Sequence, residues 1–564
     1  MVSPYLVKKK EEVLNMNLEA KRLFQLIYKK KTNSENKDES EKIIVSDMVS
    51  KLSFVYEKIR NTVDYEDEYL LRKNAIKRIF KRQVMVEGIL KDLDGKDMSI
   101  QLLTELIQAG YLKNNTVPER KIEEIAIILD KYIKLKNYSF AKEKFFFFPL
   151  NLKKSKKRTN KAQNILANWI ISLAASEIEE NLAKDDVAQE VINDAFYILK
   201  DNIKLPRDLP YEDDLDIQIY LGMLRNFLNY DNDLLSFTVF KYYNKNWSKI
   251  SDQEIEEIAD KIDVFYLAIS QQLDHPLIKQ IDKLTKSYSL YYSILKEVVE
   301  ENPIKMYEQA LNNNKSFINI IKETCEKRFK RIKNKLWKSG ARSILYIFLT
   351  KSIFVVLLEI PAVQWFGEKI NPFSLAINIS FPAILLFLMI LFTWAPAQEN
   401  TKKIIKGVEE IVYSEKRRKH NILLINPAKR SFMMDFIFNL LYLSGFVITI
   451  YFIIKFLVFI EFNWVSIIIF LFFLMFASFF SFRIKRDIKK YIIIESKEGF
   501  LGFLFDFFYT PIVAMGKFLS NNISKINIFV FIFDFIIEAP FKVFVEAFNE
   551  WLKYMRERKD DLVN

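Results

Sequence analysis

The pattern of apolar and polar positions changes near residue 342. Before that point, apolar residues recur every three or four positions among charged ones, as in "IEEIAIILDKYIKL" at residues 122–135. That spacing predicts amphipathic helices, and helix-start residues such as Ser251 and Pro303 stand before such stretches. Strand-like alternation is rare, and the chain has 11 Gly. The sequence therefore predicts an all-α fold.

After residue 342, four segments are long and apolar enough to cross a bilayer, which takes about 20 residues. Three Trp residues stand at the ends of these spans, where an indole ring favours the membrane interface. The second and fourth spans hold no charged residue, which argues against a soluble protein with buried helices. The predicted spans are residues 344–365, 373–394, 432–459 and 464–482.

Basic residues predict the direction of the spans. Residues 327–342 contain eight Lys or Arg, residues 401–430 contain nine, and residues 483–499 contain six. The two connections between, 366–372 and 460–463, hold one, Lys369. Basic residues gather on the cytoplasmic side, and the N-terminal stretch lacks the apolar region of a secretory signal. We therefore expect a multi-pass protein of the cytoplasmic membrane with both termini in the cytosol.

Two further apolar stretches, 500–519 and 526–548, carry an acidic stripe of Asp506, Asp534 and Glu538. An apolar body with a polar stripe is typical of a helix that lies in the membrane interface. A second transmembrane hairpin is the alternative. The interfacial arrangement is favoured because the polar groups would be costly in lipid, and both leave the C-terminal tail inside.

The predicted organisation has two cytosolic helical domains, a basic connecting helix, a membrane region and C-terminal amphipathic helices. Polar or basic breaks near residue 155 and around 204–216 separate the cytosolic parts. The expected boundaries are 1–155 and 156–302 for the two helical domains, 303–342 for the connecting helix, 343–483 for the four-span region and 484–564 for the C-terminal helices and tail.

A short apolar and basic segment, "EKFFFFPLNLKKSKKR", invites two interpretations. It could form a loop that inserts Phe side chains into the bilayer while Lys meets lipid head groups. A buried edge followed by a solvated loop is favoured, because short apolar runs are common core elements. The residues of the membrane-touching alternative are Phe145, Phe146, Phe147, Phe148, Lys153 and Lys154.

The chain offers little for chemistry. One Cys and two distant His residues, Cys325, His275 and His420, cannot form an ordinary zinc site, although a carboxylate site for magnesium or calcium stays open. Nucleotide-binding, hydrolase and metalloprotease motifs are missing from the sequence. We expect no catalytic residue, no cofactor and no metal. The net charge of +13 favours anionic lipid over nucleic acid, because basic residues flank the spans.

Four charges inside the spans are the strongest candidates for a site. Lys351 lies about 13 Å inside span one at 1.5 Å per residue, and Glu359 follows eight residues later. Span three carries Asp435 and Lys455. Because buried charges usually face a partner, the favoured prediction pairs Lys351 with Asp435 and Glu359 with Lys455. Snorkelling of the lysines and an ion or proton path are the alternatives.

Two stretches, "VDYEDEYLLRKNAIKRIFKR" at 63–82 and "FDFIIEAPFK" at 533–542, resemble an uncharacterised family of multi-pass membrane proteins from bacteria with small, AT-rich genomes. The resemblance implies a bacterial setting, and the family has no assigned activity that would carry over to this chain.

The functional expectation is a membrane-anchored scaffold or binding module for an unidentified cytosolic or envelope protein, in contact with anionic lipid. An oligomeric transporter or channel subunit that uses the charges of spans one and three is the alternative, with a homo-oligomer left open. A lipid-acting enzyme with carboxylates at Asp506 and Asp534 is the third class. Binding without chemistry is favoured over enzymatic activity.

Overall fold

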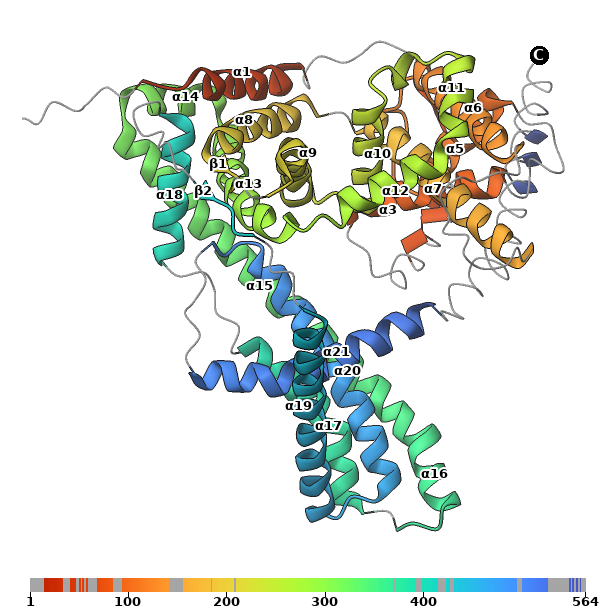
Figure 1. Ribbon diagram of the computed structural model, residues 1–564, viewed down its shortest axis with the longest axis vertical. Helices are drawn as coiled ribbons and strands as arrows, with labels where there is room; N and C mark the ends of the chain where they lie inside the picture. The colour runs from red at the N-terminus through yellow and green to blue at the C-terminus, as the bar shows by residue number, and fades with distance from the viewer. Residues whose placement is uncertain are drawn as a thin grey trace, which may run out of the picture. The chain divides into compact units, whose positions relative to one another are not determined.

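The computed structural model (Figure 1) is helical almost throughout, as the sequence predicts. The strands β1 (Ile203–Lys204) and β2 (Ile422–Leu423) are two residues each and pair in parallel. The described residues are 15–33, 41–46, 50–51, 53–54, 57–58, 68–84, 94–141, 156–183, 185–206, 209–369, 371–391, 398–413, 422–426, 431–493, 500–525 and short pieces between 547 and 558.

The chain divides into two compact units, each described here by itself. The membrane unit comprises residues 1–28, 286–420 and 425–527, and the helical head comprises residues 29–285, 421–424 and 528–564. The head contains α3 (Glu68–Arg82), α5 (Gly95–Gln108), α6 (Arg120–Ala141), α7 (Lys156–Leu182), α8 (Asp186–Asn202), α9 (Glu212–Met223), η2 (Leu224–Leu228), α10 (Asn232–Tyr243), η3 (Trp247–Lys249), α11 (Asp252–Asp260), α12 (Ile262–Leu273) and the start of α13 (Ile278–Glu301).

Helix α7 forms the centre of the helical head and packs against α3, α6, α10 and α12. Its side chains are buried around much of its circumference, including Leu166, Ile170 and Leu173. Two buried serines in this helix, Ser172 and Ser176, donate to carbonyl oxygens four residues earlier, at 3.0 and 2.8 Å. A helix surrounded by others can therefore carry hydroxyl groups in the core, because its own backbone satisfies them.

Helix starts in the structure follow the predicted signals. Ser251 caps α11 in a capping box with Glu254, in which each side chain bonds the other residue's backbone N–H. Pro303 occupies the first turn of α14 (Pro303–Asn312), behind the cap Asn302. These caps satisfy backbone N–H groups that have no partner inside the helix.

The membrane unit contains most of α1 (Leu18–Asn33), the end of α13, and then a series of long helices. These are α14, α15 (Asn314–Phe354), η4 (Val355–Glu359), α16 (Ile360–Trp365), α17 (Pro372–Leu391), α18 (Gln398–Val412), α19 (Phe432–Phe459), α20 (Trp464–Lys489) and α21 (Phe500–Lys525). The four helical segments 314–365, 372–391, 432–459 and 464–482 are long and apolar enough to cross a membrane, so the four predicted spans are confirmed as helices over their described residues, which end at residue 391 in the second span.

The connecting helix differs from the prediction of one continuous segment over 303–342. The helix is interrupted at Asn313, which leaves the helical conformation. The Asn313 side chain caps α15 by accepting from the Ser316 N–H at 3.0 Å. Short polar Asn side chains compete with helix bonds and favour such caps. From Asn314 onward α15 runs uninterrupted into span one.

Spans one, two and four pack together. α17 contacts both α15 and α20, and α20 also contacts η4 and α16. Span three, α19, packs chiefly on α21, and its buried residues are Gly445 and Leu457. The other side chains of α19 are exposed or half-buried, as suits a helix surrounded by lipid.

Helix α21 runs across α19 and α20 rather than along them (Figure 1) and contacts both. The crossing with α20 is close at Gly516, where an added Cβ would lie 2.0 Å from the carbonyl oxygen of Met475. A small residue is needed where two helix backbones approach each other. This transverse course is what the favoured interfacial arrangement of residues 500–519 predicts.

The predicted domain boundaries remain predictions. Helices α6 and α7, which flank the expected boundary near residue 155, pack against each other inside the helical head.

Candidate functional site

Lys351 and Glu359 are both fully buried among the spans, although each is ionisable. The Lys351 Nζ lies 3.9 Å from Glu359 Oε2 and 4.0 Å from the centroid of the Phe473 ring on α20. The pair therefore forms within span one, with an aromatic face against the ammonium. Lys351 has no exposed surface, so in this structure it does not snorkel to the interface.

A π-helical turn brings the two charges to the same side of the helix. At 3.6 residues per turn, an α-helix would place residue 359 about 80° around the axis from residue 351. Residues Val355–Glu359 instead form η4, in which the Ile360 N–H donates to the Val355 carbonyl. This wider turn reduces the offset. It stands directly before Pro361, which cannot donate and crowds the carbonyl four residues earlier.

Neighbouring spans supply two polar partners for Glu359. Asn378 on α17 donates its Nδ2 to Glu359 Oε1 at 2.5 Å, and Ser466 on α20 donates its Oγ to the same oxygen at 2.6 Å. Asn378 is fully buried and Ser466 is 3 % exposed. We call Lys351, Glu359, Asn378 and Ser466 the polar centre. It joins spans one, two and four through two hydrogen bonds to one carboxylate oxygen.

The polar centre differs from the predicted pairing of span one with span three. In the described part of the chain, Lys351 faces Glu359 rather than Asp435, and no ion pair includes Asp435 or Lys455. Both span-three residues are exposed, and Lys455 Nζ lies 5.8 Å from the Tyr451 ring centroid. The physical reason is the packing order, since α19 lies chiefly against α21 while α15 faces α17 and α20.

The other predicted site residues are separated from this centre. Asp506 is exposed on α21. The remaining acidic-stripe residues, Asp534 and Glu538, lie outside the described residues, as does the predicted membrane-touching loop of Phe145, Phe146, Phe147, Phe148, Lys153 and Lys154. The predicted carboxylate site and the predicted loop insertion therefore both remain predictions.

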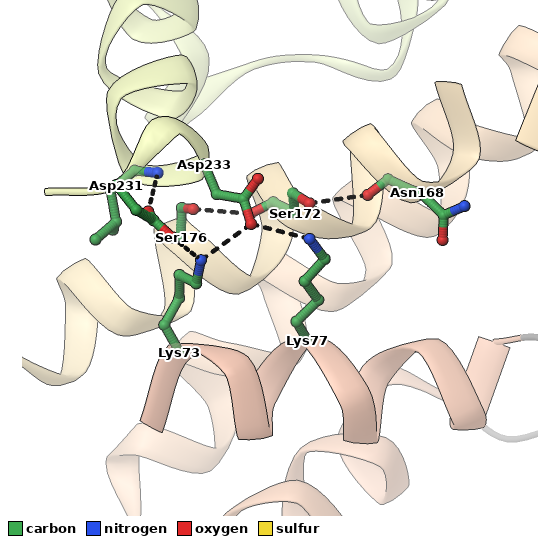
Figure 2. Close-up of polar contacts among 8 residues, drawn as sticks. Lys73, Lys77, Asn168, Ser172, Ser176, Asp231 and Asp233 are labelled. Atoms are coloured by element: carbon green, nitrogen blue, oxygen red, sulfur yellow. Dashed lines mark hydrogen bonds and ion pairs between the residues drawn. The ribbon is translucent and has the colours of Figure 1, made fainter. Parts of the chain in front are cut away.

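The helical head contains a second cluster of buried charge, between α3 and the start of α10 (Figure 2). Lys73 is 1 % exposed and pairs with Asp231 and, at 3.0 Å, with Asp233. Lys77, one turn along α3, reaches Asp233 at 2.9 Å. Asp231 also caps α10 by accepting from the Leu234 N–H. We call these four charged residues the head ion network.

Charges within the head ion network shift one another's pKa values. Burial alone would lower the pKa of Lys73, but the carboxylates of Asp233 and Asp231 outweigh it and hold that pKa above its ordinary value. Burial would raise the pKa of Asp233, and the charges of Lys73 and Lys77 reverse this and lower it. Both shifts favour the ionised network, which therefore stabilises the contact between α3 and α10.

Sequence reasoning missed Asn378, Ser466 and the head ion network. Asn378 is a polar residue in an apolar span, four residues before Pro382, and that combination was an available signal. Lys73 and Lys77 are spaced to share a helix face, and Asp231 precedes a helix as caps do, yet neither pattern names the partner.

No family model, no curated protein and no solved structure matches the chain. The resemblance of residues 63–82 and 533–542 therefore stays an observation on the sequence.

Proposed function

We propose that the chain is a multi-pass membrane protein that acts as a membrane-anchored scaffold or binding module for a protein partner. The observation that carries the proposal is the length of α15 and the set of helices that it contacts. This one helix packs against α14, α17 and α18, and its last part belongs to span one. A continuous helix of 41 residues curves only gently. It therefore suits a protein that holds other helices in a fixed position at a membrane surface.

The basic residues extend the proposal to location. We place the protein in the cytoplasmic membrane of a bacterium, with both termini in the cytosol, because the basic segments 327–342, 401–430 and 483–499 would all face the cytosolic leaflet. Residues 327–342 belong to α15, so the same helix would meet anionic head groups where it enters the bilayer.

Site-specific photo-crosslinking in native membranes tests the binding function. A photoreactive amino acid replaces Tyr242, which is 53 % exposed on α10, or Ile127, which is 67 % exposed on α6. The matched control replaces Leu443, 58 % exposed on span three, where lipid should be the neighbour. We expect discrete protein adducts from at least one head position and lipid adducts from Leu443.

The mass of the adduct identifies the partner class. A band near twice the chain mass of 67.0 kDa would indicate a homo-oligomer, and any other defined mass would indicate a separate partner. Absence of protein adducts from both head positions would contradict the binding function.

A transporter or channel subunit is the second candidate, and the polar centre is the observation that favours it. Ionisable residues inside a bundle often mark ion or proton paths. Ion flux in proteoliposomes that depends on Glu359 would support transport. Flux equal to that of empty liposomes would exclude it.

A further inference from the structure

Three basic side chains form a stripe on α15 at the start of its apolar part. Lys335, Lys338 and Arg342 follow one another at intervals of three and four residues, which places them on one face of the helix. All three are exposed, and residues 327–358 contain no Asp or Glu. In the described part of the chain no ion pair includes any of the three, and we call them the basic stripe.

The neighbouring span indicates how deep the basic stripe lies in the membrane. Gly340 lies within the stripe and packs on Ile390 of α17 so closely that the Ile390 side chain leaves no room for a Cβ there. Beside this contact α17 still exposes Leu388 and Leu391, and exposed leucines on a span face the hydrocarbon of the lipid. Trp337 is exposed on the other side of Gly340, where an indole ring favours the interface. The Gly340 contact therefore marks an edge of the hydrocarbon layer.

Each residue of the basic stripe lies at its own depth. Along the axis of α15, Arg342 lies about 3 Å deeper than Gly340, and Lys338 lies about 3 Å shallower, at 1.5 Å per residue. Lys335 lies about 7.5 Å shallower than Gly340. The head-group layer of one leaflet is about 5–7.5 Å thick, so the basic stripe extends through this layer from the hydrocarbon to the water.

The Arg342 side chain turns back toward the head groups. Its Nε donates to the Lys338 carbonyl, one helical turn earlier, at 3.3 Å. The guanidinium therefore lies on the shallower side of its own Cα, as a snorkelling side chain does. Within the described residues its two Nη groups have no protein acceptor. An Arg side chain in this position can bind two oxygens of one phosphate.

We propose that Lys335, Lys338 and Arg342 form a binding site for the phosphate of an anionic phospholipid. Positive charges at this depth are costly without a partner, and a lipid with net negative charge offsets them. A zwitterionic lipid also carries a phosphate, but its own cation compensates that charge, so the site selects a lipid such as phosphatidylglycerol. The site rests on the proposed membrane location of the chain and is independent of a protein partner.

Photo-crosslinking of the full-length protein in nanodiscs tests the site. A photoreactive amino acid replaces Leu345, which is 59 % exposed and follows Arg342 by three residues on the same face of α15. The bilayer contains equal amounts of phosphatidylglycerol and phosphatidylcholine with the same acyl chains. The matched control position is Leu443, which is 58 % exposed on span three. Mass spectrometry measures the ratio of phosphatidylglycerol to phosphatidylcholine adducts, and we expect it to be higher at Leu345 than at Leu443.

Variants assign this enrichment to the basic stripe. One basic residue near anionic lipid contributes about a fivefold preference, so Arg342→Gln should lower the adduct ratio at Leu345 about fivefold. Arg342→Lys keeps the charge and should retain most of the enrichment. Replacement of all three residues of the stripe with Gln should bring the ratio at Leu345 to the value at Leu443.

A matched control variant removes three positive charges from another helix. Helix α18 lies outside the four candidate spans and exposes three lysines, Lys402, Lys403 and Lys406. Replacement of these three lysines with Gln makes the same change in net charge. It should leave the adduct ratio at Leu345 as it is in the unchanged protein.

Three results would overturn the proposal. The first is the same adduct ratio at Leu345 and Leu443 in the otherwise unchanged protein. The second is an enrichment at Leu345 that survives replacement of the whole basic stripe, and the third is an equal loss of enrichment in the α18 control. Absence of lipid adducts at both positions would instead contradict the membrane location on which the site rests. The scaffold function is tested separately, by protein adducts from the helical head.

Discussion

Replacing Lys73 with Met tests whether the head ion network holds α3 to α10. Met keeps an unbranched apolar stem and removes the ammonium. Asp231 then loses its ion pair, while Asp233 keeps its contact with Lys77. The matched control is Lys77→Met, which removes a lysine from the same face of the same helix.

The expected cost follows from burial. Removing one partner of a fully buried ion pair costs about 3–5 kcal/mol. Lys73 is 1 % exposed, but the two aspartates are each 27 % exposed, so water partly solvates the stranded carboxylates. We therefore expect about 2–3 kcal/mol for Lys73→Met, below that range. Lys77 is 33 % exposed, and its loss should cost about 0.5–1 kcal/mol.

Hydrogen exchange read by mass spectrometry measures this locally, in the amides of α10. A loss of 2–3 kcal/mol corresponds to exchange that is about 30- to 150-fold faster, at 1.4 kcal/mol per factor of ten. The control should exchange no more than about fivefold faster. If Lys73→Met exchanges no faster than Lys77→Met, burial of the Lys73 charge is not what stabilises this contact.

Two further predictions concern pH and helix packing. The lowered pKa of Asp233 contributes stability that is present above the ordinary Asp pKa of 3.8 and is lost as the pH falls through the lower pKa of the folded state. The raised pKa of Lys73 contributes stability that is complete below the ordinary Lys pKa of 10.5 and is lost as the pH rises through the higher pKa of the folded state. Protection of α10, corrected for intrinsic exchange, should therefore be flat from about pH 7 to pH 9, and a step inside that window would refute the assignment. Gly516→Leu should separate α21 from α20, because even a Cβ there would lie 2.0 Å from the Met475 carbonyl oxygen; a distance between spin labels on α20 and α21 that stays within about 1 Å of the original would contradict the close approach.

The spans could be predicted because each is a property of one continuous segment. An apolar run as long as 464–482 has few alternatives to a membrane helix. Contacts between spans are different, because they depend on which helices are neighbours. The prediction that Lys351 pairs with span three required α19 to lie beside α15, and no residue pattern records that order.

Local departures from regular α-helix account for the other features that the sequence did not predict. The pairing of Lys351 with Glu359 depends on the π turn η4. The one sequence signal for that turn is Pro361. The break at Asn313 was readable as an Asn cap, but the surrounding basic helix pattern concealed it. Asn378 and Ser466 become visible as partners once spans one, two and four are placed together.

The orientation of the four spans is the central claim, and cysteine labelling in intact cells tests it most directly. In a Cys325→Ser background, one variant carries Lys369→Cys, between spans one and two, and another carries Lys402→Cys, on α18; both positions are exposed. A membrane-impermeant maleimide should label Lys369→Cys in intact cells and Lys402→Cys only after the membrane is permeabilised. Labelling of Lys402→Cys in intact cells, with Lys369→Cys protected, would contradict the account.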